Sequence, residues 1–150
     1  MDLNFWMDAS SSWGIGLLCE GHWAAWKWLD GWESDFREIS WAEGVAVELA
    51  VCLLDVRDRS NLHVLLHSDN QGVIGAYQQG RGRNPEVNDS IRCVDIIASV
   101  QNISFSFTYV ESEANLADLI SRGILGCSDL QLPDIPLPIK LSQYMVHVYG

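Results

Sequence analysis

Short apolar stretches separated by polar turns fill the start of the chain. The segments 3–8, 13–19 and 22–29 have the apolar and aromatic pattern of strands, and Ser10-Ser11-Ser12 is a turn-forming sequence between the first two. Consecutive strands joined by short turns pair as antiparallel neighbours. The pattern therefore predicts a three-stranded antiparallel meander, followed by an irregular, charged connection over residues 30–40.

A long run of helix-forming residues covers 41–56, and Ser40 is suited to cap the start of this helix. At about 100° per residue, one narrow stripe of the helix is polar and consists of Gly44, Glu48, Asp55 and Arg59. This stripe predicts that Glu48 faces solvent. Glu43 lies about 140° from Glu48, so only one of the two can face a site beneath the helix.

A strand, a polar turn and a helix follow in the next part of the chain. Residues 62–67 form a short apolar strand, and residues 72–79 have helical character. Connections between parallel strands of one sheet are right-handed crossovers, which places strand 62–67 parallel to strand 3–8 and beside it. We therefore expect Asp8 and the residues after the second strand to be neighbours.

The pattern after residue 80 predicts a helix, a strand and a last helix. Asn84 and the proline after it are typical of a helix start, and this helix continues to about residue 100. Clean alternation over 103–110 predicts a strand, and 112–122 predicts a helix that ends at Gly123.

The end of the chain contains several prolines that disfavour regular structure, namely Pro133, Pro136 and Pro138. We interpret residues 126–150 as an extended tail or linker and residues 1–125 as one domain. The order of elements, three strands and then α-β-α-α-β-α, predicts an α/β fold in which helices flank a mixed sheet.

Four carboxylates fall at positions where this topology can bring them together: Asp8, Glu43, Asp69 and Asp118. The first central strand carries Asp8, the end of the second carries Asp69, and two different helices carry Glu43 and Asp118. Two-metal phosphodiester cleavage requires a compact cluster of hard oxygen ligands, which carboxylates provide. Taken singly, each of the four also fits an ordinary turn, helix-dipole or ion-pair role.

The residues around these carboxylates resemble the four motifs of ribonuclease H, in the same order and on matching elements. The matching segments are Met7-Asp8-Ala9-Ser10, Trp41-Ala42-Glu43-Gly44-Val45-Ala46, His67-Ser68-Asp69-Asn70-Gln71 and Asn115-Leu116-Ala117-Asp118-Leu119-Ile120-Ser121-Arg122. The resemblance covers about residues 3 to 125. In detail the chain is similar to the ribonuclease H domain of retroelement reverse transcriptases, of the DIRS-like kind found in fungi.

This resemblance implies a ribonuclease H-like fold with a five-stranded mixed sheet in the order 3-2-1-4-5. It implies an endonuclease that cuts the RNA strand of RNA–DNA hybrids, with two Mg²⁺ or Mn²⁺ ions held by the four carboxylates. Relatives often have a histidine before the last aspartate, whereas residues 110–115 contain none. Glu111 or Glu113 is the candidate substitute.

Contacts to the hybrid are expected from polar residues near the carboxylates. Ser10, Asn70 and Gln71 are candidates for contacts with 2′-hydroxyl groups, or are ordinary turn residues. Arg81 and Arg83 lie among glycines and could follow a phosphate backbone, or form a solvated loop. The tryptophans all lie within residues 1–41 and are expected in an aromatic core or docking surface rather than in base stacking.

Composition and hydropathy limit the class of protein. The 150 residues are 48% apolar, which suffices for a core, and no stretch is long and apolar enough to span a bilayer. Without a secretion signal at the start, we expect an intracellular protein with no membrane partner.

The net charge of −11 is unusual for a protein that binds phosphates. We therefore expect an attached or associated reverse transcriptase domain to supply much of the affinity.

Two alternatives remain from the sequence. The acidic surface, the tryptophan-rich start and the missing histidine also fit a non-catalytic structural or docking module. A transposase or integrase core shares fold and metals, but it uses an acidic triad whose last member is on the final helix, and the helical Glu43 argues against it.

Overall fold

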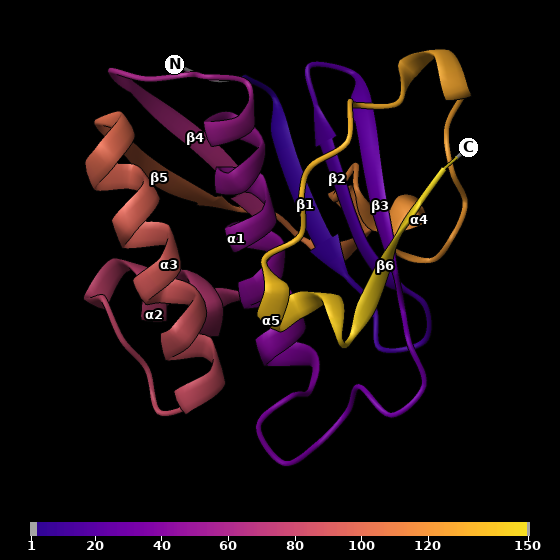
Figure 1. Cartoon of the computed structure of the whole chain (residues 1–150), viewed down its shortest axis with the longest axis horizontal. Coiled ribbons are helices and arrows are strands. Elements are labelled where there is room, and N and C mark those ends of the chain that lie inside the picture. Colours follow the sequence, from indigo (N-terminus) through magenta and orange to yellow (C-terminus); the bar gives the residue numbers. More distant parts are fainter. Residues whose placement is uncertain (1–2, 150) are drawn as a thin grey trace.

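The computed structural model describes residues 3–149, and its centre is one mixed sheet of six strands. The strands run in the order β5-β4-β1-β2-β3-β6 (Figure 1). Their bounds are β1 Phe5–Ala9, β2 Gly14–Cys19, β3 His22–Trp28, β4 Leu62–Ser68, β5 Ile103–Tyr109 and β6 Met145–Val148. The mixed sheet flanked by helices confirms the α/β class, but the sheet has six strands rather than the five predicted.

Strands β1, β2 and β3 form the predicted antiparallel meander. Strand β4 lies parallel to β1 and beside it, as predicted, with Phe5 opposite Leu66 and Trp6 opposite His67. Strand β5 continues the parallel part beside β4. The carboxyl ends of β1 and β4 therefore meet at the same edge of the sheet.

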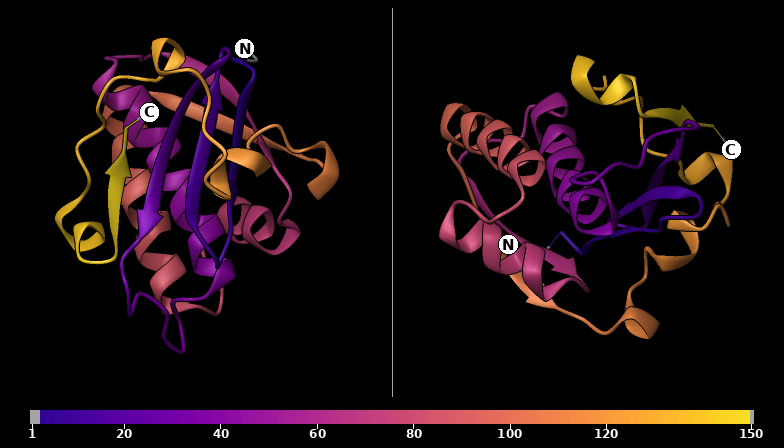
Figure 2. Two further views of the ribbon diagram at one scale, coloured as in Figure 1. Left: turned by 90° about the vertical axis from the view of Figure 1, so that its right-hand side faces the viewer. Right: turned by 90° about the horizontal axis from the view of Figure 1, so that it is seen from below.

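Side chains of β3 alternate between two hydrophobic clusters, one on each face of the sheet. Ala24 and Trp26 pack into the large core with α1 (Ile39–Val56), whereas Trp23 and Ala25 pack with Ile120 on the other face. The helices α2 (Gln71–Gln79) and α3 (Pro85–Gln101) lie on the α1 side (Figure 2). The sheet is thus covered on both faces near β3.

Aromatic residues from the start of the chain form part of this core, as predicted. Trp28 stacks on Trp32 with ring centroids 4.0 Å apart, and Trp41 lies 5.8 Å from Trp28. All of these rings are buried. These three rings pack in the core, and none of them is accessible for stacking on nucleic acid bases.

The first helix differs from its prediction at two points. It begins at Ile39, because Ala42 N donates to Glu38 O at 2.9 Å, so Ser40 lies inside the first turn and does not cap it. The expected solvent-facing stripe is wrong at Gly44 and Glu48, since every residue from 41 to 54 is buried, whereas Asp55 and Arg59 are partly exposed. The cause is α3 together with the tail, which cover the sides of the helix that the sheet leaves open.

The predicted continuous helix over 112–122 is wrong as well. The chain forms a 3-10 turn, Ser112–Ala114, and then the short helix α4, Asp118–Ser121. Asn115 between them is extended, and its buried side chain donates to Met7 O and accepts from Ala117 N. These side-chain bonds replace the backbone bonds that a continuous helix would make at this point.

Regular structure returns after Pro138, contrary to the expectation for the tail. Following a 3-10 turn, Ser128–Leu130, the chain forms α5 (Ile139–Ser142) and then β6, which pairs antiparallel with β3. Leu132, Ile135, Leu141 and Met145 are buried in the main core. The open edge of β3 supplies backbone partners that local sequence does not reveal.

An ion pair ties this tail to α1. Lys140 Nζ of α5 lies 3.7 Å from Glu48 Oε1, and Ser90 of α3 also faces the carboxylate. Burial is the main cause that raises the pKa of Glu48, and Lys140 opposes the rise. The Glu48 side chain is fully buried, whereas that of Lys140 is 38% exposed. The tail thus supplies the cation that a buried charge needs.

We expect Lys140→Ala to lower the free energy of unfolding by about 2 kcal/mol at pH 8, less than for a fully buried pair because Lys140 is partly exposed. The loss should shrink as the pH is lowered, since protonated Glu48 no longer needs a cation. Urea unfolding at pH 8 and pH 5 measures this, with Arg92→Ala, which breaks the exposed Arg92–Asp89 pair, as control. Equal losses for both variants would contradict the role of the pair.

Candidate functional site

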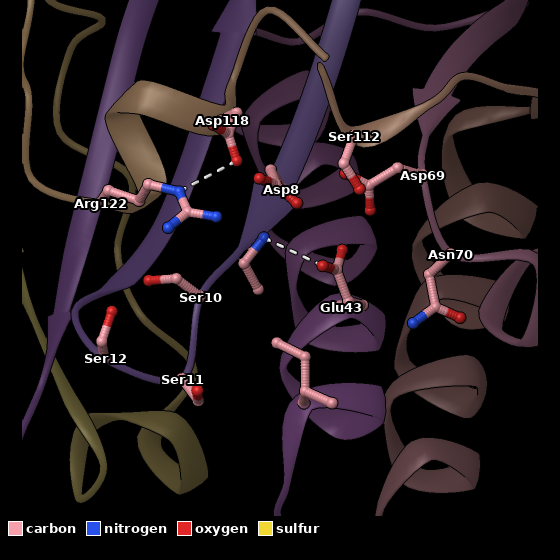
Figure 3. A pocket seen from close by; sticks show the side chains of 12 residues that line it. Asp8, Ser10, Ser11, Ser12, Glu43, Asp69, Asn70, Ser112, Asp118 and Arg122 are labelled. Carbon is pink, nitrogen blue, oxygen red and sulfur yellow. Dashed lines mark hydrogen bonds and ion pairs between the residues drawn. The ribbon is translucent and has the colours of Figure 1, made fainter. Parts of the chain in front are cut away.

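Three of the four predicted carboxylates meet at the edge where β1 and β4 end. Asp8 belongs to β1, Asp69 directly follows β4, and Glu43 reaches them from α1, which packs across β1. One oxygen of each lies within 4.8 Å of the others. Figure 3 shows the three side chains pointing toward one another. They line a cavity of about 360 Å³.

Burial and mutual repulsion set the charge state of this cluster. Asp8 and Glu43 are each only 4% exposed. Burial first, and the charge of Asp69 second, raise the pKa of Asp8 to about 7. Burial, followed by the charges of Asp8 and Asp69, raises the pKa of Glu43 well above its usual range. The fold thus holds these groups where protons or cations must compensate their charge.

Each carboxylate is fixed by a donor from a different segment. Ala9 N donates to Glu43 Oε1 at 3.3 Å, and the hydroxyl of Ser121 lies 3.1 Å from Asp8 Oδ2. Asn115 Nδ2 donates to Asp69 Oδ2 at 3.2 Å. The other oxygen of Glu43, Oε2, is buried without a hydrogen-bond partner among residues 3–149. An unpartnered buried carboxylate oxygen directed into an acidic cavity fits a cation ligand.

The fourth predicted carboxylate, Asp118, lines the same cavity but lies outside the group of three. Its Oδ1 accepts from Arg122 Nε at 3.2 Å, so a guanidinium already compensates its charge. Helix α4 reaches this position because Gly16 of β2 has no side chain. A Cβ at Gly16 would lie 2.7 Å from Ser121 N.

The predicted hybrid-binding residues are spread over several places. Ser10 lines the cavity, but it is buried and its hydroxyl donates to Ser121 O at 2.5 Å. Asn70 also lines the cavity while its side chain caps α2, and Gln71 is exposed beside it. Arg81 is exposed, and Arg83 lines a separate cavity between α1, α2 and α3.

Sequence reasoning assigned no role to Asn115 and Ser121, which shape the centre. It considered Arg122 only as the (i, i+4) ion-pair partner of Asp118, and the structure contains that pair. All lie in the segment that resembles the last ribonuclease H motif, but their spacing alone does not show which side chains turn inward. Glu111 and Glu113, the suggested substitutes for a histidine, are exposed and do not line the cavity, whereas Ser112 between them does.

The donor set suits Mg²⁺ or Mn²⁺. All the converging atoms are carboxylate oxygens, the ligand type that these hard cations take, and no sulfur or imidazole ligand shares the group of three. Asp8, Glu43 and Asp69 could hold one ion directly. Asp118 lines the cavity and is a candidate ligand for a second ion.

Comparisons with protein families and with curated proteins find no match to this chain. None of the helices in the described residues has the length and apolar character needed to cross a membrane.

We expect the metal-free protein to lose stability as the pH rises from about 4 to above 7. The pKa of Asp8 is raised in the folded state, so its contribution to stability is fully present below the unfolded pKa and is lost as the pH passes 7. Asp8→Asn should therefore be more stable than the natural chain at pH 8, by on the order of 3 kcal/mol. The variants should differ little at pH 4.

Urea unfolding in chelator measures this difference, with exposed Asp129→Asn as the matched control. If the natural chain were equally stable at pH 4 and pH 8, the fold would not raise the pKa of Asp8, and the prediction would be wrong.

Asn115→Ala tests the donor that holds Asp69. We expect about a 10-fold loss of Mn²⁺ affinity, because a ligand freed from its outer hydrogen bond must be ordered on binding. Calorimetric titration measures the affinity, and Asn88→Ala, which removes two bonds to Gly82 on the surface, is the control. Unchanged affinity in Asn115→Ala would exclude this positioning role.

Proposed function

We propose that this chain is a metal-dependent endonuclease that hydrolyses the RNA strand of RNA–DNA hybrids, as the ribonuclease H-type domain of a retroelement reverse transcriptase. The observation that carries the proposal is the convergence of Asp8, Glu43 and Asp69, with Asp118 in the same cavity. These are the four positions at which the sequence resembles the ribonuclease H motifs.

The topology supports the same proposal. Read from β3, the first five strands lie in the order 3-2-1-4-5, with β1 antiparallel to β2 and parallel to β4. This is the order that the ribonuclease H resemblance implies. Strand β6 adds to the far edge, away from the carboxylates.

The chemistry is hydrolysis without a protein nucleophile. Water attacks the phosphorus, the bond to the 3′ oxygen breaks, and the products are a 5′-phosphate and a 3′-hydroxyl. Two Mg²⁺ or Mn²⁺ ions bound at the carboxylates would supply the Lewis acid that activates the water and stabilises the leaving oxygen.

The chain's own residues bind the metal ions and orient the carboxylate ligands. Asp8, Glu43 and Asp69 provide the oxygen ligands, and Asn115, Ser121 and the backbone of Ala9 keep these carboxylates in place. The raised pKa of Asp8, about 7, means that ligand formation releases a proton and is favoured at higher pH. Selection of RNA over DNA requires polar groups at the 2′-hydroxyl, and Asn70 at the cavity wall is the candidate.

The charge of the chain favours an attached polymerase domain as partner. At a net charge of −11, compensation of the acidic cavity still leaves an acidic surface. Affinity for the hybrid therefore requires cations from another domain. This is the arrangement of a ribonuclease H domain within a reverse transcriptase.

Asp69→Asn should abolish Mg²⁺-dependent cutting of a labelled RNA–DNA hybrid, because it removes one ligand without changing the size of the side chain. The control is Asp129→Asn on the exposed surface, which should cut like the natural chain. Cutting that survives Asp69→Asn would refute the site. A strand-transfer assay on DNA tests the integrase alternative. We expect no strand transfer, because the helical Glu43 argues against an integrase core.

The non-catalytic alternative makes a separate prediction. A structural module has no need of the cation, so the natural chain would neither cut the hybrid nor bind Mn²⁺ in a saturable way. Saturable binding that is lost in Asp8→Asn supports the nuclease instead.

A further inference from the structure

One cationic side chain lies in the wall of the acidic cavity. Among the described residues that line it, Arg122 is the single lysine or arginine, together with Asp8, Glu43, Asp69 and Asp118 (Figure 3). It directly follows α4, whose Ser121 contacts Asp8. Arg122 is therefore held to the centre by the same short helix that brings Asp118 there.

The geometry of Arg122 leaves most of its donors unused. Its Nε donates to Asp118 Oδ1 at 3.2 Å, and its side chain is 59% exposed. Its terminal nitrogens, Nη1 and Nη2, have no partner within residues 3–149. A guanidinium presents five N–H groups in a planar fork that matches the oxygens of a phosphate. Four of these N–H groups remain available at the mouth of the cavity.

Two cations compete for the carboxylate of Asp118. Its Oδ1 accepts a hydrogen bond from Arg122, and the proposed function assigns the same carboxylate to a metal ion. Asp118 is 29% exposed on its side chain, so it can exchange partners without opening the core. When Asp118 takes another cation, the guanidinium loses its hold and is free to turn toward a ligand in the cavity.

We infer that Arg122 binds a phosphate of the nucleic acid strand beside the carboxylates, and that Asp118 holds its guanidinium at the cavity until that carboxylate takes up a cation. This inference rests on the proposed function. Before Asp118 takes up a cation, Arg122 offsets the charge of Asp118. Once Asp118 holds the cation, the guanidinium of Arg122 makes a forked contact with a phosphate of the substrate.

Charge balance supports this assignment. Four carboxylates line the cavity. Two divalent cations would match their charge, and Arg122 would then leave one positive charge. A phosphodiester carries one negative charge. The other arginines considered for the hybrid lie elsewhere, because Arg83 lines a different cavity and Arg81 follows α2 on the surface. In an acidic chain, Arg122 is the cation positioned next to the proposed cutting site.

The first test is the salt dependence of hybrid binding, measured with the full chain and Ca²⁺ in place of Mg²⁺ to suppress cutting. Each phosphate contact contributes about 0.9 to the slope of log affinity against log salt. We expect Arg122→Ala to reduce the slope by about 0.9 and Arg122→Lys to retain it. Arg92→Ala is the matched control, because Arg92 pairs with Asp89 three residues before it on the exposed side of α3.

The second test is Mn²⁺ titration without nucleic acid. Arg122→Ala should bind Mn²⁺ about 5-fold more tightly than the natural chain, because Asp118 no longer has a competing partner. Arg122→Lys should lie between the two, and Arg92→Ala should match the natural chain. Neither readout depends on the rate of cutting.

The results separate the two proposals. If the natural chain binds neither Mn²⁺ nor the hybrid, the proposed function fails and the inference fails with it. If Mn²⁺ binding is present and is lost in Asp8→Asn, but Arg122→Ala keeps the natural salt slope, the phosphate role of Arg122 is overturned while the nuclease stands. An unchanged Mn²⁺ affinity in Arg122→Ala overturns the competition for Asp118.

Discussion

Repulsion between buried carboxylates is the constraint on which the rest of this structure depends. Parallel pairing of β1 with β4 puts Asp8 beside Asp69, and α1 adds Glu43 over the same edge. Their charges cost free energy in a poorly solvated cavity unless protons or cations offset them. Donors from Ala9, Asn115 and Ser121 fix the oxygens but do not neutralise them. The arrangement lowers the stability of the metal-free fold and leaves a carboxylate cluster that could hold a cation.

Helix α1 connects the two regions of buried charge. Glu43 faces the cavity, and Glu48, on another side of the same helix, faces Lys140 of the tail. Both carboxylates are buried because the sheet covers one side of α1 and the tail with α3 covers the other. The difference is the partner. The tail supplies a cation for Glu48. The three carboxylates of the cavity instead repel one another and form a group that could hold a metal ion.

Helix α4 brings opposite charges to one place on the outer face of the sheet. Gly16 allows its backbone to approach β2, and this brings Ser121 to Asp8 and the Asp118–Arg122 pair to the cavity. Under the proposed function, this acidic chain would have to keep the carboxylates that hold cations apart from the negative charge that repels the substrate. Arg122 beside the carboxylates, together with cations from the proposed attached domain, would meet that requirement.

The sequence by itself determined the elements whose signals are local. Alternation predicted the strands, Asn84 and Pro85 predicted the start of α3, and the right-handed crossover predicted that β4 lies beside β1. It also selected Asp8, Glu43 and Asp69 before their distances were known. The (i, i+4) spacing of Asp118 and Arg122 indicated their ion pair as well. Only the tertiary structure decided the burial of Glu48, the break at Asn115 and the addition of β6. These features depend on partners far along the chain, and helical or strand periodicity carries no information about such partners.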